Sequence, residues 1–124
     1  MGYCIDQRGC KFFIDKSNVE NVKNVLKKHM SEFSHGSRKN FDDMSIEELF
    51  EDLRWQIDFD DFDNINYIFF IGEKSWDEFE VLSLISEYVK NGSYIEMSGE
   101  DGSMWRWVFD GKNVKEIYPE IKWE

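Results

Sequence analysis

Three Ser-x-x-Glu motifs constrain the fold of this chain more than any other feature. They begin at Ser17, Ser45 and Ser75. In such a capping box, the serine oxygen accepts a hydrogen bond from a free N–H of the first helical turn, and the glutamate accepts one from the serine N–H. Apolar residues at spacings of three and four follow each motif. The sequence therefore predicts three amphipathic helices that start at these serines.

The three predicted helices differ in length. The first should run for about four to five turns and end before His35, because its apolar stripe stops there. The second is short, since its stripe spans only Ile46 to Leu53. The third should continue through Val89 and stop at Gly92, because glycine readily adopts the left-handed conformation that ends helices.

A hairpin is expected between the second and third helices. Residues 55–60 alternate between apolar and polar side chains, which predicts a half-buried strand with Asp58 and Asp60 on its outer face. Residues 61–64 have the composition of a turn. The returning run, 66–71, is apolar on both faces, so we expect it to be central in the sheet.

The N-terminal segment allows two interpretations. Two short β-prone runs, 3–6 and 10–14, flank Gly9 and form either a hairpin or one strand with a kink at the glycine. A hairpin would bring Cys4 and Cys10 close enough for a disulfide. In a cytosolic protein, however, both are expected to be reduced thiols.

The C-terminal third predicts a meander. Residues 93–98, 104–109 and 114–118 form three strands joined by glycine turns, and 121–124 could add a short fourth.

The Trp-Arg-Trp sequence within this meander has two readings. Trp105, Trp107 and Phe109 share one strand face at a period of two, which is typical of a core face covered by helices. An aromatic platform for nucleic acid bases would need a basic surround. The C-terminal half is acidic, so we interpret these rings as core residues and Arg106 as part of the more solvated face.

These elements predict an α+β fold. We expect a mainly antiparallel sheet with helices packed on one face, a βαββαβ-like core and a C-terminal β-meander. A chain of 124 residues is expected to form a single domain, 1–124. There is no basic-then-apolar leader and no apolar run of roughly 20 residues, so the sequence predicts a cytoplasmic protein without a membrane partner.

The charge distribution is uneven. The net charge is −11, and residues 42–63 contribute ten acidic residues and only one basic residue, Arg54. Residues 1–41 have a net charge of +4. A strongly negative field repels nucleic acid phosphates and attracts cationic partners. Nucleic acid binding is therefore not expected.

The candidate partner-binding residues are eight carboxylates of this acidic segment. If the second helix and the following strand are neighbours, these side chains form one patch. They are Glu47, Glu48, Glu51, Asp52, Asp58, Asp60, Asp61 and Asp63.

The charge pattern favours a non-enzymatic protein that docks on a basic protein surface, such as an inhibitor or an immunity or anti-defence protein. The sequence supports equally well a purely solubilising role for the acids. The alternative function is a small enzyme or ligand-binding domain with a pocket between sheet and helices. The sequence does not specify an oligomeric state.

The sequence predicts no catalytic residues, cofactor or metal. No register of the aspartates around Asp60 supplies the glycine and glutamate of an EF-hand loop. Cys4, Cys10, His29 and His35 are spaced too loosely for a zinc finger. The chain contains neither a glycine-rich phosphate loop nor a serine in a nucleophile elbow.

Both ends of the chain carry a resemblance. The opening Met1-Gly2-Tyr3-Cys4-Ile5 and the stretches 92–102, 105–111 and 123–124 resemble small acidic proteins of Gram-positive bacteria, their phages and mobile elements. These proteins have no assigned activity. The resemblance implies a cytosolic bacterial or phage setting and assigns no functional residue.

Overall fold

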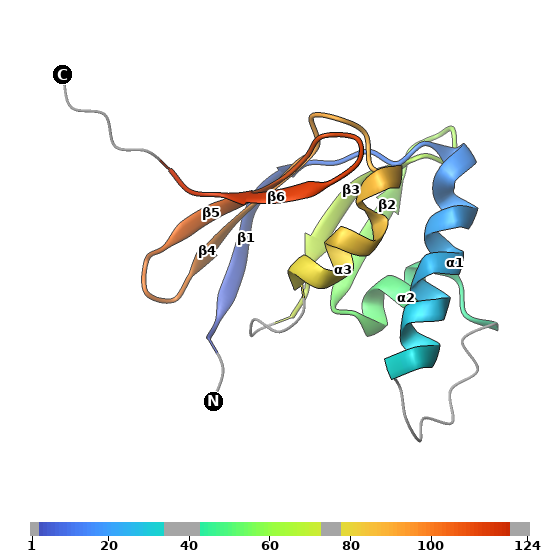
Figure 1. The fold of residues 1–124 in the computed structure, drawn as a ribbon, viewed down its shortest axis with the longest axis horizontal. Coiled ribbons are helices and arrows are strands. Elements are labelled where there is room, and N and C mark those ends of the chain that lie inside the picture. Colours follow the sequence, from blue (N-terminus) through green and yellow to red (C-terminus); the bar gives the residue numbers. More distant parts are fainter. Residues whose placement is uncertain (1–2, 34–42, 73–77, 120–124) are drawn as a thin grey trace.

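The computed structural model describes residues 3–33, 43–72 and 78–119 and shows an α+β fold (Figure 1). The predicted fold class is confirmed. A 3₁₀ turn over Ser86–Tyr88 follows the third helix. In chain order the elements are β1 (Ile5–Lys11), α1 (Lys16–Phe33), α2 (Ile46–Asp52), β2 (Trp55–Phe59), β3 (Ile65–Phe70), α3 (Glu78–Ile85), β4 (Tyr94–Gly99), β5 (Met104–Phe109) and β6 (Val114–Ile117).

The strands form two antiparallel sheets. The larger sheet has the order β1-β4-β5-β6, so the predicted C-terminal meander is confirmed. The hairpin of β2 and β3 forms a separate two-stranded sheet. The prediction that β3 is a central, doubly buried strand is therefore wrong. Tyr67 and Phe69 on its outer face are 39% and 38% exposed.

Gln7 connects the two sheets. Its side-chain Nε2 donates to the carbonyl of Ile68, and its Oε1 accepts from the N–H of Phe70, each at 2.8 Å. Further along, Ile14 and Ile65 exchange two backbone hydrogen bonds of 2.8 and 2.9 Å. The glutamine amide thus takes the place of a peptide group where the backbones of β1 and β3 do not pair.

The N-terminal segment is one strand with an irregularity, and this settles the choice between the two interpretations. The register of β1 against β4 shifts between Gln7 and Gly9. Cys4 and Cys10 are free thiols in this arrangement.

The helix starts agree only in part with the sequence motifs. The capping box at Ser45 is confirmed, with Ser45 and Glu48 bonded reciprocally at 3.1 and 3.2 Å. The motif at Ser17 is not the cap. The Asp15 carboxylate accepts from the Ser17 N–H at 2.9 Å and α1 begins at Lys16, so Asp15 caps the helix two residues earlier than predicted. The motif at Ser75 lies outside the described residues.

The end of the third helix also differs from the prediction. The α-helix stops at Ile85, and the following turn tightens to 3₁₀ geometry. Ser86 Oγ lies 2.8 Å from the carbonyl of Ser83 and 2.9 Å from that of Lys112, so the helix end is attached to the β5–β6 connection. Gly92 has a φ of 93°, but it lies in the turn into β4 and its N–H donates to Phe109.

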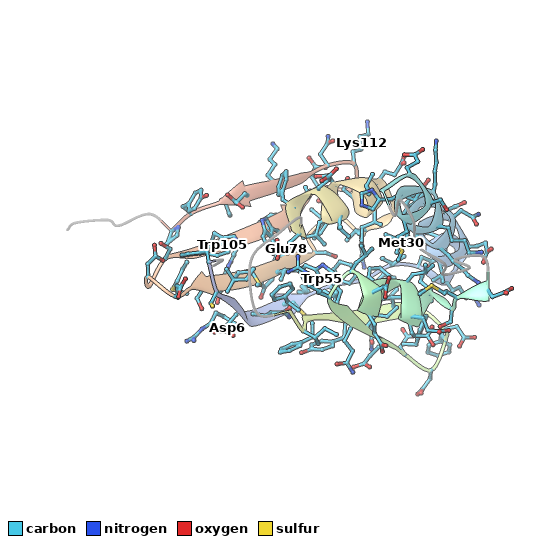
Figure 2. The ribbon with its side chains drawn as sticks, turned by 90° about the horizontal axis from the view of Figure 1, so that it is seen from below. Asp6, Met30, Trp55, Glu78, Trp105 and Lys112 are labelled. Carbon is cyan, nitrogen blue, oxygen red and sulfur yellow. The ribbon has the colours of Figure 1, made fainter. Side chains whose placement is uncertain are left out.

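The helices cover one side of the strands, as predicted (Figure 1). Trp107 and Phe109 are 3% and 0% exposed, so their assignment to the core is confirmed, whereas Trp105 is half-buried. Trp55 is fully buried and lies near the centre of the molecule (Figure 2). None of the helices that the structure describes is long and apolar enough to cross a membrane.

Candidate interaction surface

The acidic residues of α2 lie on its solvent side. Ile46, Leu49 and Phe50 form the buried side of this short helix. The exposed side chains opposite them are Glu47, Glu48, Glu51 and Asp52. The sequence pattern therefore predicted the polar face of α2 correctly.

Glu48 has a local structural role in addition to its charge. Its carboxylate accepts from the backbone N–H of Ser45 in the capping box. This hydrogen bond lowers the pKa of Glu48 below its ordinary value. Part of the negative charge on α2 thus stabilises the helix that carries it.

The acids of the hairpin divide in the same way. Asp58 lies exposed on β2, and Asp61 and Asp63 are exposed in the turn. Asp60 is half-buried, and its carboxylate accepts from the N–H of Phe62, the N–H of Asn64 and the Asn64 side-chain amide, at 2.9 to 3.0 Å. These hydrogen bonds lower the pKa of Asp60, and the one from the Asn64 side chain has the largest effect. Asp60 therefore organises the turn beyond the end of β2, and the prediction that it lies on the outer face of the strand is wrong.

These carboxylates follow one another in chain order along α2, β2 and the hairpin turn. Only Leu53 and Arg54 separate α2 from β2. The four acids of α2 precede the strand, Asp58 lies within it, and three acids follow it. Because five strand residues span about 16 Å, the helix group and the turn group lie toward opposite ends of β2 (Figure 1).

Aromatic side chains accompany the acids on the hairpin, which the sequence reasoning missed. The register pairs Asp58 with Tyr67 and Gln56 with Phe69. All four side chains are exposed, and we refer to them as the outer hairpin face. Strict alternation in β2 was a usable signal, since it identified the solvent side of β2 and therefore of its partner strand.

The two rings of the outer hairpin face are arranged as a pair. Tyr67 and Phe69 have ring centroids 6.4 Å apart and an interplanar angle of 13°. Partial burial raises the pKa of the Tyr67 hydroxyl, and Coulombic interactions with Cys10 and then Asp58 contribute to the same shift. The register therefore places Asp58 opposite the Tyr67 end of this aromatic pair.

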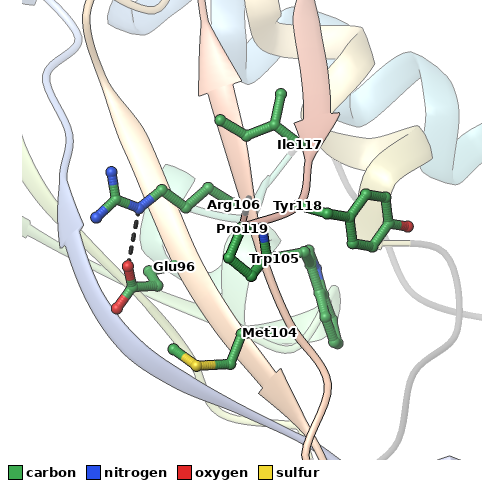
Figure 3. Close-up of a pocket in the computed structure, with 7 residues that line it drawn as sticks. All are labelled: Glu96, Met104, Trp105, Arg106, Ile117, Tyr118 and Pro119. Carbon is green, nitrogen blue, oxygen red and sulfur yellow. Dashed lines mark hydrogen bonds and ion pairs between the residues drawn. The ribbon is translucent and has the colours of Figure 1, made fainter. Parts of the chain in front are cut away.

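A shallow hollow lies on the other sheet, beside β5 and β6 (Figure 3). It has a volume of about 210 Å³. Arg106 at its wall donates to Glu96 at 2.8 Å, and its guanidinium lies 4.8 Å from the Tyr94 ring centroid. The remaining wall is mainly apolar and is formed by Met104, Trp105, Ile117, Tyr118 and Pro119.

The hollow does not lie where the ligand-binding alternative placed a pocket. In the described part of the chain, buried apolar side chains such as Leu26, Leu49, Trp55 and Leu82 form the core between helices and strands. Among the same residues, no group of three or more His, Cys, Asp or Glu side chains is placed to hold a metal ion. His29 is half-buried on α1, and His35 lies outside the described residues.

The fold and this surface define a small α+β domain with an exposed acidic and aromatic hairpin. Comparison with protein-family models, curated proteins and solved structures finds no match to this chain.

Proposed function

We propose that this protein is a non-enzymatic binding protein that docks on a basic surface of another protein. Its docking surface consists of the α2 carboxylates and the acids of the β2–β3 hairpin. The observation that carries the proposal is the exposure of seven of the eight candidate carboxylates on consecutive elements. Only Asp60 among them is half-buried.

The physical basis is electrostatic steering. Clustered like charges destabilise a compact free protein, and a cationic partner relieves that repulsion. The same field attracts the partner before contact and raises the association rate. Screening by salt reduces this attraction beyond about 8 Å at physiological ionic strength.

The partner in this proposal is a basic protein, such as a nuclease or another protein with a phosphate-contacting groove. An acidic domain that occupies this groove would act as an inhibitor, as expected for an immunity or anti-defence protein. A cytosolic bacterial or phage setting, implied by the resemblance of the chain ends, belongs to the same proposal.

The test begins with affinity capture from the host at low and high salt, followed by association kinetics with the captured protein. The triple variant Asp58→Asn, Asp61→Asn, Asp63→Asn leaves Asp60 and the turn intact. Asparagine also tolerates the positive φ of 65° at position 63. We expect association to slow by about tenfold or more and to lose most of its salt dependence.

A matched control removes the same charge elsewhere. Asp6→Asn, Glu20→Gln and Glu80→Gln change three exposed acids outside the proposed surface. This control should slow association much less. Equal effects of the two triple variants would show that only net charge matters, and a rate indifferent to both variants and to salt would overturn the proposal.

A ligand-binding role is the second candidate, favoured by the hollow of Figure 3. Its apolar wall beside an ion pair is typical of a site that buries an apolar ligand with one polar group. A fragment screen followed by NMR tests it. Saturable shifts confined to Trp105 and Arg106 would support this role, and their absence would exclude it for the compounds used.

A further inference from the structure

We propose that the outer hairpin face is a receptor site for an arginine side chain of the basic partner protein. The Tyr67–Phe69 pair would stack on the guanidinium, and Asp58 would bind its N–H groups. This inference rests on the proposed function and identifies the chemistry of the central contact.

The aromatic pair is the first observation. Tyr67 and Phe69 are neighbours on the outer face of β3, with nearly parallel rings, and each is more than one-third exposed. Exposed aromatic rings bury large areas on binding at a small entropic cost, which is why they are common at the centres of protein interfaces. The pair therefore supplies apolar contact area within a surface that is otherwise acidic.

The second observation is the position of Asp58. It lies directly opposite Tyr67 in the β2–β3 register, where side chains on the same sheet face contact one another. Arginine is the side chain that matches both features, because its planar guanidinium stacks on aromatic faces and also donates two parallel hydrogen bonds to a carboxylate. A lysine ammonium is a strongly hydrated point charge and gains less from a ring face.

The chain's other sheet contains a filled version of the same arrangement. There the Arg106 guanidinium lies over Tyr94 and its Nε donates to Glu96 at 2.8 Å. The outer hairpin face repeats the combination of a tyrosine ring and a carboxylate. Among the described residues, the rings that hold a cation of the chain are Phe13, Phe70 and Tyr94. No such contact between a cation of the chain and the Tyr67–Phe69 pair is found in the part of the chain that the structure describes.

Other occupants fit the charge less well. A nucleic acid base could stack on the rings, but its phosphates would be repelled by Asp58 and by the surrounding segment 42–63, whose net charge is −9. A second copy of this chain also has a net charge of −11 and would therefore be repelled. Charge complementarity therefore favours a cationic protein.

The test uses two synthetic peptides of the same length, one with several arginines and one with lysines at the same positions. Binding is followed by NMR titration of the full chain, using the ring signals of Tyr67 and Phe69. We expect the arginine peptide to bind about tenfold more tightly. The double variant Tyr67→Ala, Phe69→Ala should remove this preference, and Asp58→Asn should weaken binding of the arginine peptide.

The controls separate this inference from the proposed function. Phe79→Ala removes an exposed ring on α3 and should leave the preference unchanged. Tyr67→Phe keeps the ring and should retain most of it. Equal affinities for the two peptides, or ring variants that bind like the parent, would overturn the arginine site while the aspartate variants still test the acidic surface. Failure of both peptides to bind would overturn the arginine site, and the association kinetics with the captured protein would still decide the proposed function.

Two further measurements address the other occupants. A single-stranded oligonucleotide that shifts the Tyr67 and Phe69 signals more strongly than the arginine peptide would replace the inference with a base-stacking site. Sedimentation that shows a dimer, dissociated by Tyr67→Ala with Phe69→Ala, would replace it with self-association.

Discussion

Trp55 of β2 and Trp107 of β5 lie edge to face across the core, with ring centroids 6.2 Å apart. The two residues belong to different sheets, so their contact joins the hairpin to the meander. Trp55 also packs edge to face on Phe70, at 5.2 Å. Aromatic pairs in this geometry contribute about 0.5–1.5 kcal/mol beyond their buried area.

This contact makes Trp107 the more critical of the two tryptophans on β5. Trp107→Ala should lower the free energy of unfolding by about 3–5 kcal/mol, because it removes a buried ring and leaves a cavity. Trp105→Ala should cost clearly less, since Trp105 is only half-buried. Urea unfolding of both variants measures the difference. A Trp107→Ala protein that unfolds at the same urea concentration as the parent would contradict the core assignment.

Gln7 should be important for the junction of the two sheets. Gln7→Met keeps the length of the side chain but leaves the Phe70 N–H and the Ile68 carbonyl without this partner. We expect a loss of about 2 kcal/mol in unfolding free energy, together with faster hydrogen exchange at Phe70. The exposed neighbour Asp6→Ala is the control. Unchanged exchange at Phe70 in Gln7→Met would show that the junction does not depend on this amide.

Asp60 should make folding stability depend on acid pH. Its hydrogen bonds lower its pKa in the folded state, and the hydrogen bond from the Asn64 side chain has the largest effect. A depressed pKa contributes stability that is present above the unfolded value of about 3.9 and is lost as the pH falls through the folded value. Asp60→Asn should therefore flatten the fall in stability below about pH 4. Thermal unfolding at several pH values tests this, with Asp61→Asn as the neighbouring control.

Gly99 should be required because of Tyr3. A Cβ atom at position 99 would clash with the Tyr3 hydroxyl oxygen and the adjacent ring carbons. Gly99→Ala should therefore displace the Tyr3 ring and break its hydrogen bond to Asp101. The substitution should be destabilising in the parent and nearly neutral in a Tyr3→Ala background, as measured by a double-mutant cycle. Equal costs in the two backgrounds would contradict this contact.

The sequence by itself determined the features that depend on neighbouring residues. The capping box at Ser45 formed because its partners are three residues apart, so no distant contact is needed. Gly102 and Gly111 have positive φ values of 88° and 94° at the predicted turns, where a side chain would be strained. Alternation in residues 55–60 likewise identified the solvent side of β2, and with it Asp58.

Only the tertiary structure decided the features that depend on what covers a surface. Residues 65–70 are apolar on both faces, but exposure of Tyr67 and Phe69 follows from the absence of described residues packed over that face, which the pattern of β3 itself does not encode. Asp15 is the helix cap in place of Ser17, in a segment that pairs Ile14 with Ile65 and directs the Lys16 N–H to Asn64. A local hydrogen bond can be predicted from sequence where no distant contact competes with it, as at Ser45. The burial of a strand face is a long-range property, because it requires segments distant in the chain to meet.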